Sequence, residues 1–422
     1  MTDTTFAQGT IIEPTWLQDA NDHVNDKTGI KHSASKISNT PAGNISATTV
    51  QAAIDELDTE KQPLHANLTA LNTTASQAEM EAGTETALRA MSPKLVLDAI
   101  TYNQSAYQNF FINGDMRVQQ RPAVTPSSSR QIGQVDRWAY QASNASMTGS
   151  TNSLGGVTVS NRQVLNAQAA FTAANAHIFD QRVEAKECWS LGGKEITVSG
   201  YVWQNSSTSQ NWYWDVYKAT AGENNFSTYA NIATGSASPT SVAASAVAET
   251  GWVRVSLTFT PAAADCAYGL EFHIRSANSA GALTSHNVRL RDCQLEIGGT
   301  ATTFAPKEYS EELAACMRYW ETSYAIGQTI GTASNTGKLA YVDPRNGSNA
   351  NIEFKVDKVK PPAVTCYSSQ SGTVNTYYDA TSMTDRTPVV LEISESRCRI
   401  TFVAPGAVDH SLFWHYVADA EL

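Results

Sequence analysis

The chain has 422 residues, a formal net charge of −11 and only 16% charged residues. This length suits about two or three domains, and the acidic balance argues against nucleic acid as a general partner. No apolar run approaches the roughly 20 residues of a membrane span, so we expect no membrane-embedded segment.

The first residues, MTDTTFAQGTIIEP, have no basic start and no hydrophobic signal core, so we expect synthesis in a cytoplasm without a cleaved signal. The six cysteines form no Cys-x-x-Cys pair, which predicts buried free thiols rather than a zinc or redox motif.

Residues 1–30 are too few for a fold of their own. Trp16 and Leu17 are apolar anchors among polar neighbours. We therefore expect this segment to dock on a larger partner.

Residues 31–108 carry short helical patterns and a heptad. Its seam positions are Val50, Ile54, Leu57, Lys61, Leu64, Leu68 and Leu71. Thr48 and Gln51 have the spacing of a capping box, and Pro63 should end the helix. Two heptads fit a short helical or coiled-coil shaft, but equally a lone amphipathic helix.

Residues 109–305 change character, because polar and apolar residues alternate strictly in several runs. These runs are residues 195–203, 212–218, 252–260, 268–275 and 287–298. Many short antiparallel strands with one buried face predict an antiparallel jelly-roll β-sandwich, so the fold class is mainly β.

Residues 306–422 begin with a helical run, YSEELAACMRYWETSY, which Ser310 is placed to cap. Further strand patterns follow, including GKLAYV, RCRITFV and SLFWHYVA. They predict a smaller C-terminal β-sandwich as a separate domain.

Four stretches resemble bacteriophage tail-fibre and receptor-binding proteins: GTIIEPTWLQDAND, ASQAEMEAGTETALRAMSPKLVLDAI, NFFINGDMRVQQR with VDRWAY, and LRDCQLEIGGTATTFAPKEYSEELAACMRYW. The third and fourth are similar to the opening and closing strands of a carbohydrate-binding-module-like jelly roll. The resemblance implies a virion-attached homotrimer. Its N-terminal segment, with Trp16 and Leu17, would dock on a tail or baseplate protein, and its tip would bind a host surface glycan or protein.

Sugar recognition combines flat aromatic faces with a few polar groups. In the run NWYWDVY, alternation places Trp212, Trp214 and Val216 on one face, and we expect that face to be core. Tyr213, Asp215 and Tyr217 would then be exposed candidates for a glycan site, or ordinary cross-strand packing.

Two polar loops of the C-terminal domain are further receptor candidates, because function often lies on loops. The alternative is two solvated hairpin loops. The candidate residues are Asn375, Tyr377, Tyr378 and Asp379 in one loop, and Asp343, Arg345 and Asn346 in the other.

Asp115 and Asp292 are candidate ligands of a structural calcium, which the resemblance places near the first and last strands of such jelly rolls. Arg117 stands where another acidic ligand would help, so an ion pair of either carboxylate with Arg117 or Arg291 is the alternative. No other cofactor is expected.

The sequence contains no catalytic motif such as Gly-x-Ser-x-Gly, His-Glu-x-x-His or a phosphate loop. It therefore favours an adhesive tail-fibre subunit over an enzyme. The alternatives are an envelope-polysaccharide depolymerase and a purely structural tail or baseplate component.

Overall fold

A computed structural model describes residues 35, 37–42, 45–59, 109–125, 127–142, 147–148, 155–159, 162–171, 175–205, 209–243, 245, 250–277, 283–344, 349–402 and 408–422, with single positions 15 and 96. The chain divides into two compact units, residues 1–100 and 101–422. Trp16, Leu17 and the shaft beyond residue 59 lie outside the described residues. No helix in the described ranges is both long and apolar enough to cross a membrane.

In the first unit, residues 50–59 form a helix. Thr49, not Thr48, caps it, because the Thr49 hydroxyl oxygen accepts from the Ala52 N–H at 3.2 Å. The seam residues Ile54 and Leu57 are 52% and 37% exposed in the single chain. The shaft and its coiled coil stay predictions.

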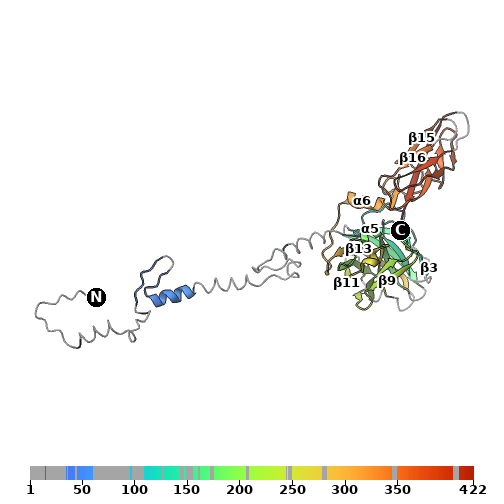
Figure 1. Cartoon of the computed structure of the whole chain (residues 1–422). Helices are drawn as coiled ribbons and strands as arrows, with labels where there is room; N and C mark the ends of the chain where they lie inside the picture. The colour runs from blue at the N-terminus through green and yellow to red at the C-terminus, as the bar shows by residue number, and fades with distance from the viewer. Residues whose placement is uncertain are drawn as a thin grey trace. The chain divides into compact units, whose positions relative to one another are not determined.

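Two antiparallel sheets form the jelly-roll sandwich of the second unit (Figure 1). Within the described residues, sheet A has the order β1 (Gln131–Ile132), β2 (Ala139–Ala142), β6 (His177–Val183), β12 (Leu270–Ser276), β8 (Gln210–Ala219) and β10 (Thr240–Val242), with β9 (Tyr229–Thr234) beside β8. Sheet B has the order β11 (Val253–Phe259), β7 (Ile196–Gln204), β13 (Leu283–Ile297), β5 (Arg162–Phe171) and β3 (Met147–Thr148), with β4 (Gly155–Val159) beside β5. Short helical turns α5 (Ala185–Cys188) and η2 (Ala263–Cys266) connect strands.

The jelly-roll core confirms the alternation expected from the sequence. Trp212, Trp214 and Val216 are fully buried in it. Phe111 also enters the core, and its ring contacts those of Trp138 and Trp214 at centroid distances of 5.2 and 6.0 Å. Burying such large apolar side chains stabilises the sandwich by about 1.5–3 kcal/mol each.

The opening segment of the jelly roll pairs with β13, far along the chain. The Phe110 N–H donates to the Leu295 carbonyl, and the Cys293 N–H donates to the Gly114 carbonyl, both at 2.9 Å. A Cβ on Gly114 would lie 2.2 Å from the Cys293 carbonyl oxygen, so only glycine fits there. The two ends of the jelly roll are therefore neighbours, as the resemblance implied.

Helix α6 (Tyr309–Met317) precedes a second, smaller sandwich (Figure 1). Glu308 is at its N-cap position, and Ser310 lies inside the first turn, so the predicted Ser310 cap is wrong. In sheet C, β22 (His410–Asp419) pairs with β14 (Trp320–Thr322), β15 (Leu339–Asp343), β17 (Ala363–Ser368) and β18 (Tyr377–Asp379), and β19 (Thr384–Arg386) pairs with β18. In sheet D, β21 (Arg397–Thr401) lies between β16 (Asn349–Glu353) and β20 (Val389–Leu391).

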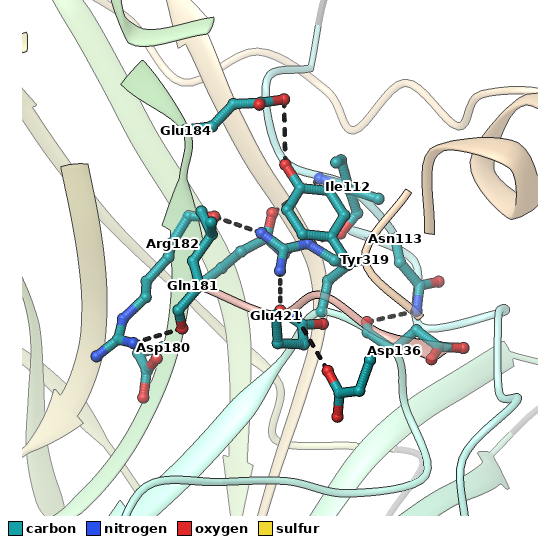
Figure 2. Close-up of polar contacts among 12 residues, drawn as sticks. Ile112, Asn113, Asp136, Asp180, Gln181, Arg182, Glu184, Tyr319 and Glu421 are labelled. Carbon is teal, nitrogen blue, oxygen red and sulfur yellow. Dashed lines mark hydrogen bonds and ion pairs between the residues drawn. The ribbon is translucent and has the colours of Figure 1, made fainter. Parts of the chain in front are cut away.

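Charged residues join the segment after β22 to the jelly roll (Figure 2). Glu421 pairs with the buried Arg137 and, at 2.8 Å, with Arg121. Burial alone would raise the pKa of Glu421, but the two guanidiniums lower it below its ordinary value. Beside this pair, the Tyr319 hydroxyl donates to Glu184 at 3.2 Å.

The predicted burial of all six cysteines as free thiols is confirmed.

Candidate functional site

The face of sheet A that points away from the core is polar and aromatic. Because alternate strand residues share a face, the strand pairing arranges its side chains in cross-strand rows. One row holds Arg182, Glu271, Tyr217 and Asn231; the next holds Asp180, His273, Asp215 and Thr234; the third holds Arg275 and Tyr213. With Tyr229 of β9, we call these residues the outer face of sheet A.

Three tyrosines make the aromatic part of the outer face. The Tyr217 ring meets the Tyr229 ring edge-on at 5.3 Å and the His273 ring at 4.7 Å. The Arg275 guanidinium lies 5.1 Å from the centre of the Tyr213 ring. Tyr213 and Tyr217 are half-buried and Tyr229 is 49% exposed, so the neighbours hold the rings in place while part of each stays open to a ligand.

Charges alternate beneath these rings. Glu271 lies 3.2 Å from the His273 Nε2 and 3.4 Å from the Arg182 Nε. Burial by itself would raise the pKa of Glu271, but His273, Arg182 and Arg130 lower it to about 2. Glu271 therefore stays ionised and acts as a fixed hydrogen-bond acceptor.

The carboxylates of Asp180 and Glu271 and the His273 ring lie within 4.8 Å of one another, close enough to be tested as a metal site. The Arg130 Nε lies 2.6 Å from Asp180 and 3.7 Å from Glu271. A guanidinium thus already stands where a cation would bind, so the residues do not fit a metal.

The ionised state of Glu271 also bears on whether this cluster could hydrolyse a polysaccharide. Glycoside hydrolysis needs one carboxyl group that holds a proton and a second that is ionised. Because His273, Arg182 and Arg130 lower its pKa, Glu271 favours the ionised form and does not fit the role of that acid next to Asp180. This pair gives no support to the depolymerase alternative.

Three of the residues predicted from the sequence meet on the outer face: Tyr213, Asp215 and Tyr217. Asp215 is only 4% exposed and accepts a hydrogen bond from Thr234, so it positions its neighbours more than it faces solvent. The sequence reasoning missed Glu271, His273 and Arg275. The alternation in residues 268–275 was the signal that could have placed them beside β8.

The predicted loop sites of the C-terminal sandwich need correction. Tyr377 lies in β18 and is fully buried against Phe402, with ring centres 4.9 Å apart. Asp379, also fully buried, pairs with Arg386 and His410 at 3.0 and 2.7 Å, and thereby ties β18 to β19 and β22.

The remaining loop candidates differ in how exposed their side chains are. Asp343 is buried at the end of β15. Asn375 is exposed in a turn with a φ of 58°, and Tyr378 is half-buried, so both are open to a ligand. Arg345 and Asn346 lie outside the described residues.

The corner predicted to hold calcium brings Asp115 and Asp292 to the rim of one pocket. Asp115 pairs with Arg117, and Asp292 pairs with Arg162 and, at 3.7 Å, with Arg291. The ion-pair alternative is therefore what the structure contains, and this arginine-rich corner does not fit calcium.

No family model and no curated protein matches the sequence. Among solved structures, the chain is similar to a carbohydrate-binding module of the β-sandwich superfamily, at 10% identity over 41% of this chain and 62% of that chain, with a TM-score of 0.27. It is also similar to the CBM22-1 xylan-binding domain from Paenibacillus barcinonensis, at 14% identity over 46% of this chain and 97% of that domain, with a TM-score of 0.25.

A third similar structure is a mannan-recognising carbohydrate-binding module, at 9% identity over 38% of this chain and 89% of that module, with a TM-score of 0.26. These neighbours are β-sandwich modules, as is the jelly roll described above. Because the identities and TM-scores are low, any function has to be inferred from the residues of the outer face.

Proposed function

We propose that the chain is a bacteriophage tail-fibre subunit whose jelly roll adheres to a glycan on the host cell surface through the outer face of sheet A. The observation that carries the adhesive part is the grouping of Tyr213, Tyr217 and Tyr229 on one sheet face with ion-paired charged groups. Sugar C–H groups stack on such rings, and sugar hydroxyls bond to the charged and amide groups beside them.

The tail-fibre part rests on the sequence resemblance given above. In this proposal the protein is part of the virion tail, residues 1–30 dock on a tail or baseplate protein, and residues 31–108 form the trimeric shaft. Because several copies would bind one cell, weak single sites would gain about 10²- to 10⁴-fold in avidity.

Labelling of bacterial cells tests the adhesion. Fluorescent full-length protein is incubated with a panel of bacterial strains, before and after periodate oxidation of their surface glycans. Wild type should label at least one strain, and periodate should remove the label. The double variant Tyr217→Ala/Tyr229→Ala should label at least tenfold less.

The control is Tyr268→Ala, which removes a tyrosine that is 46% exposed elsewhere on the jelly roll. Labelling that survives both periodate and the double substitution would contradict the proposal. If protease treatment of the cells removes the label and periodate does not, the receptor is a protein, and the glycan part of the proposal is overturned.

The oligomeric mass tests the shaft. The resemblance implies a trimer, so we expect native mass spectrometry of the full-length protein to give one, in which partner chains cover Ile54 and Leu57, exposed in the single chain. A monomer would contradict the fibre assignment, since the apolar seam would then have no partner to cover it.

A further inference from the structure

The pocket that Asp115 and Asp292 line lies at the corner where the first segment of the jelly roll meets sheet B. Its volume of about 490 Å³ is in the usual range for small-ligand sites. It is lined by Asp115, Arg117, Arg162, Gln163, Asp292, Phe304, Pro306 and Tyr309. These residues come from the opening segment, β5, β13, the segment that leads into α6 and the first residue of α6.

The backbone aims Asp292 into this corner. The pairing of β13 with β7 shifts register between Arg291 and Gln294, and Asp292 has a φ of 49°. Bulges of this kind re-aim a side chain, and a non-glycine residue with positive φ costs free energy. The fold therefore maintains an unfavourable backbone conformation at a residue that lines the pocket.

Each carboxylate of the pocket stands beside a guanidinium. Asp115 pairs with Arg117, and Asp292 pairs with Arg162. Both salt bridges of Asp292 use the same oxygen, Oδ2, so within the described part of the chain its Oδ1 is left to accept from a ligand. An acceptor next to a donor matches two adjacent hydroxyl groups.

The pocket lining also has an apolar part. Phe304, Pro306 and Tyr309 form it, and the Tyr309 residue is 38% exposed. The Arg117 guanidinium lies 6.0 Å from the centre of the Tyr309 ring and helps to hold that ring. A part-exposed ring in the same pocket as a polar pair suits the C–H face of a sugar.

We infer that this corner pocket binds one pyranose residue of a neutral glycan. Tyr309 stacks on the sugar ring, while the Asp292–Arg162 pair bonds two neighbouring hydroxyls. The two carboxylates and two guanidiniums of the lining balance in charge, which favours an uncharged sugar over an anionic one. The inference deepens the proposed function and rests on it, because it gives the jelly roll a second glycan site in addition to the outer face of sheet A.

Saturation-transfer NMR with simple sugars tests the pocket. The probes are the methyl pyranosides of glucose, galactose and mannose, titrated into full-length wild type, Arg162→Ala and Tyr309→Ala. The Arg162 side chain is 54% exposed, so we expect its removal to leave the fold intact, and a circular-dichroism spectrum like that of wild type checks this. At least one methyl pyranoside should bind, and each substitution should weaken its affinity at least tenfold.

Tyr217→Ala/Tyr229→Ala and Tyr268→Ala serve as comparisons, and both should keep the pocket signal. The inference is overturned if wild type binds none of the three sugars, or if the affinity is unchanged in both pocket variants. Failure of the proposed function would appear separately, as cell labelling that does not respond to the Tyr217→Ala/Tyr229→Ala change.

Discussion

Two buried histidines show what single residues contribute to this jelly roll. The Nδ1 of His177 lies 2.9 Å from the Tyr140 hydroxyl, and its Nε2 lies 2.9 Å from the Nδ1 of His286. Burial lowers the pKa of His286 to about 4, and burial together with His286 lowers that of His177 well below its ordinary value. Both rings are therefore neutral in the folded protein at neutral pH.

This pair predicts a loss of stability in mild acid. Because the pKa of His286 is about 4 in the folded protein and 6.5 for an unperturbed histidine, the unfolded chain binds the proton first. The stabilisation is complete above pH 6.5 and is lost as the pH falls towards 4, at a cost of up to about 3 kcal/mol. Denaturant unfolding at several pH values measures how the free energy of unfolding changes with pH.

The matched variant is His286→Gln, which cannot titrate but can still accept a hydrogen bond from His177. It should show a smaller loss of stability over this range than wild type. Burial raises the pKa of Asp136 to about 6, but that residue is unchanged in the variant, so its contribution cancels in the comparison. Equal pH dependence of the two proteins would rule out His286 as the cause.

The burial of single residues was predicted correctly where it follows the alternation along a strand. It was predicted wrongly where contacts with distant parts of the chain determine it. Trp212 and Tyr213 are neighbours that face opposite ways, which the period of two predicts. Tyr377 and Asp379 stand in a polar, turn-like run, yet they are buried by Phe402 and His410 from elsewhere in the chain. No local pattern carries that information.

At the scale of elements, Asn109 joins the opening segment to β13. Its side-chain amide donates to the Cys293 carbonyl at 2.9 Å, and its carbonyl oxygen accepts from the N–H groups of Phe111 and Leu295 at 3.0 Å. Asn109→Ala would leave three buried backbone groups unpaired. We expect the free energy of unfolding in urea to fall by about 3 kcal/mol.

Asn211→Ala is the control, because Asn211 is exposed on β8 of the same sandwich. It should change the free energy of unfolding by less than about 0.5 kcal/mol. If both variants were equally stable, the contacts between residues 109–114 and β13 would contribute little to the free energy of unfolding.

Strands were predictable where polar and apolar residues alternate along the sequence. Strands β7, β8, β11, β12 and β13 all lie where alternating runs predicted them. Strand β6 was not predicted, because in its run HIFDQRV the apolar Ile178 and Phe179 are adjacent and three polar residues follow them, so polar and apolar residues do not alternate. Its Asp180 is covered by Arg130 from a separate segment, a contact that only the fold creates.

At the scale of the whole molecule, Glu421 connects the two sandwiches. Arg137 is 1% exposed and Arg121 is 7% exposed at the side chain, so Glu421→Ala would leave two buried guanidiniums without this partner. We expect a loss of about 3 kcal/mol or more. Calorimetry should show one transition for the two sandwiches in wild type and two in the variant.

The control is Glu395→Ala, since Glu395 is exposed in the smaller sandwich. It should leave the single transition in place. A single transition in Glu421→Ala as well would mean that the sandwiches unfold together through other contacts.

The whole-molecule organisation was only partly predictable. Periodicity predicted two β-sandwiches, and both are present, with cores of their own. The charge network of Arg137 and Glu421 spans 284 positions and has no sequence signature. Tail docking, the trimeric shaft and attachment to a virion stay predictions from the resemblance.

Binding of the full-length protein to an array of bacterial surface polysaccharides tests the central claim most directly. We predict that wild type binds at least one polysaccharide, and that Tyr217→Ala/Tyr229→Ala reduces this binding at least tenfold while Tyr268→Ala does not. Wild-type binding to none of the polysaccharides, or binding that the double variant leaves unchanged, would contradict the assignment of the outer face of sheet A as a glycan-binding surface.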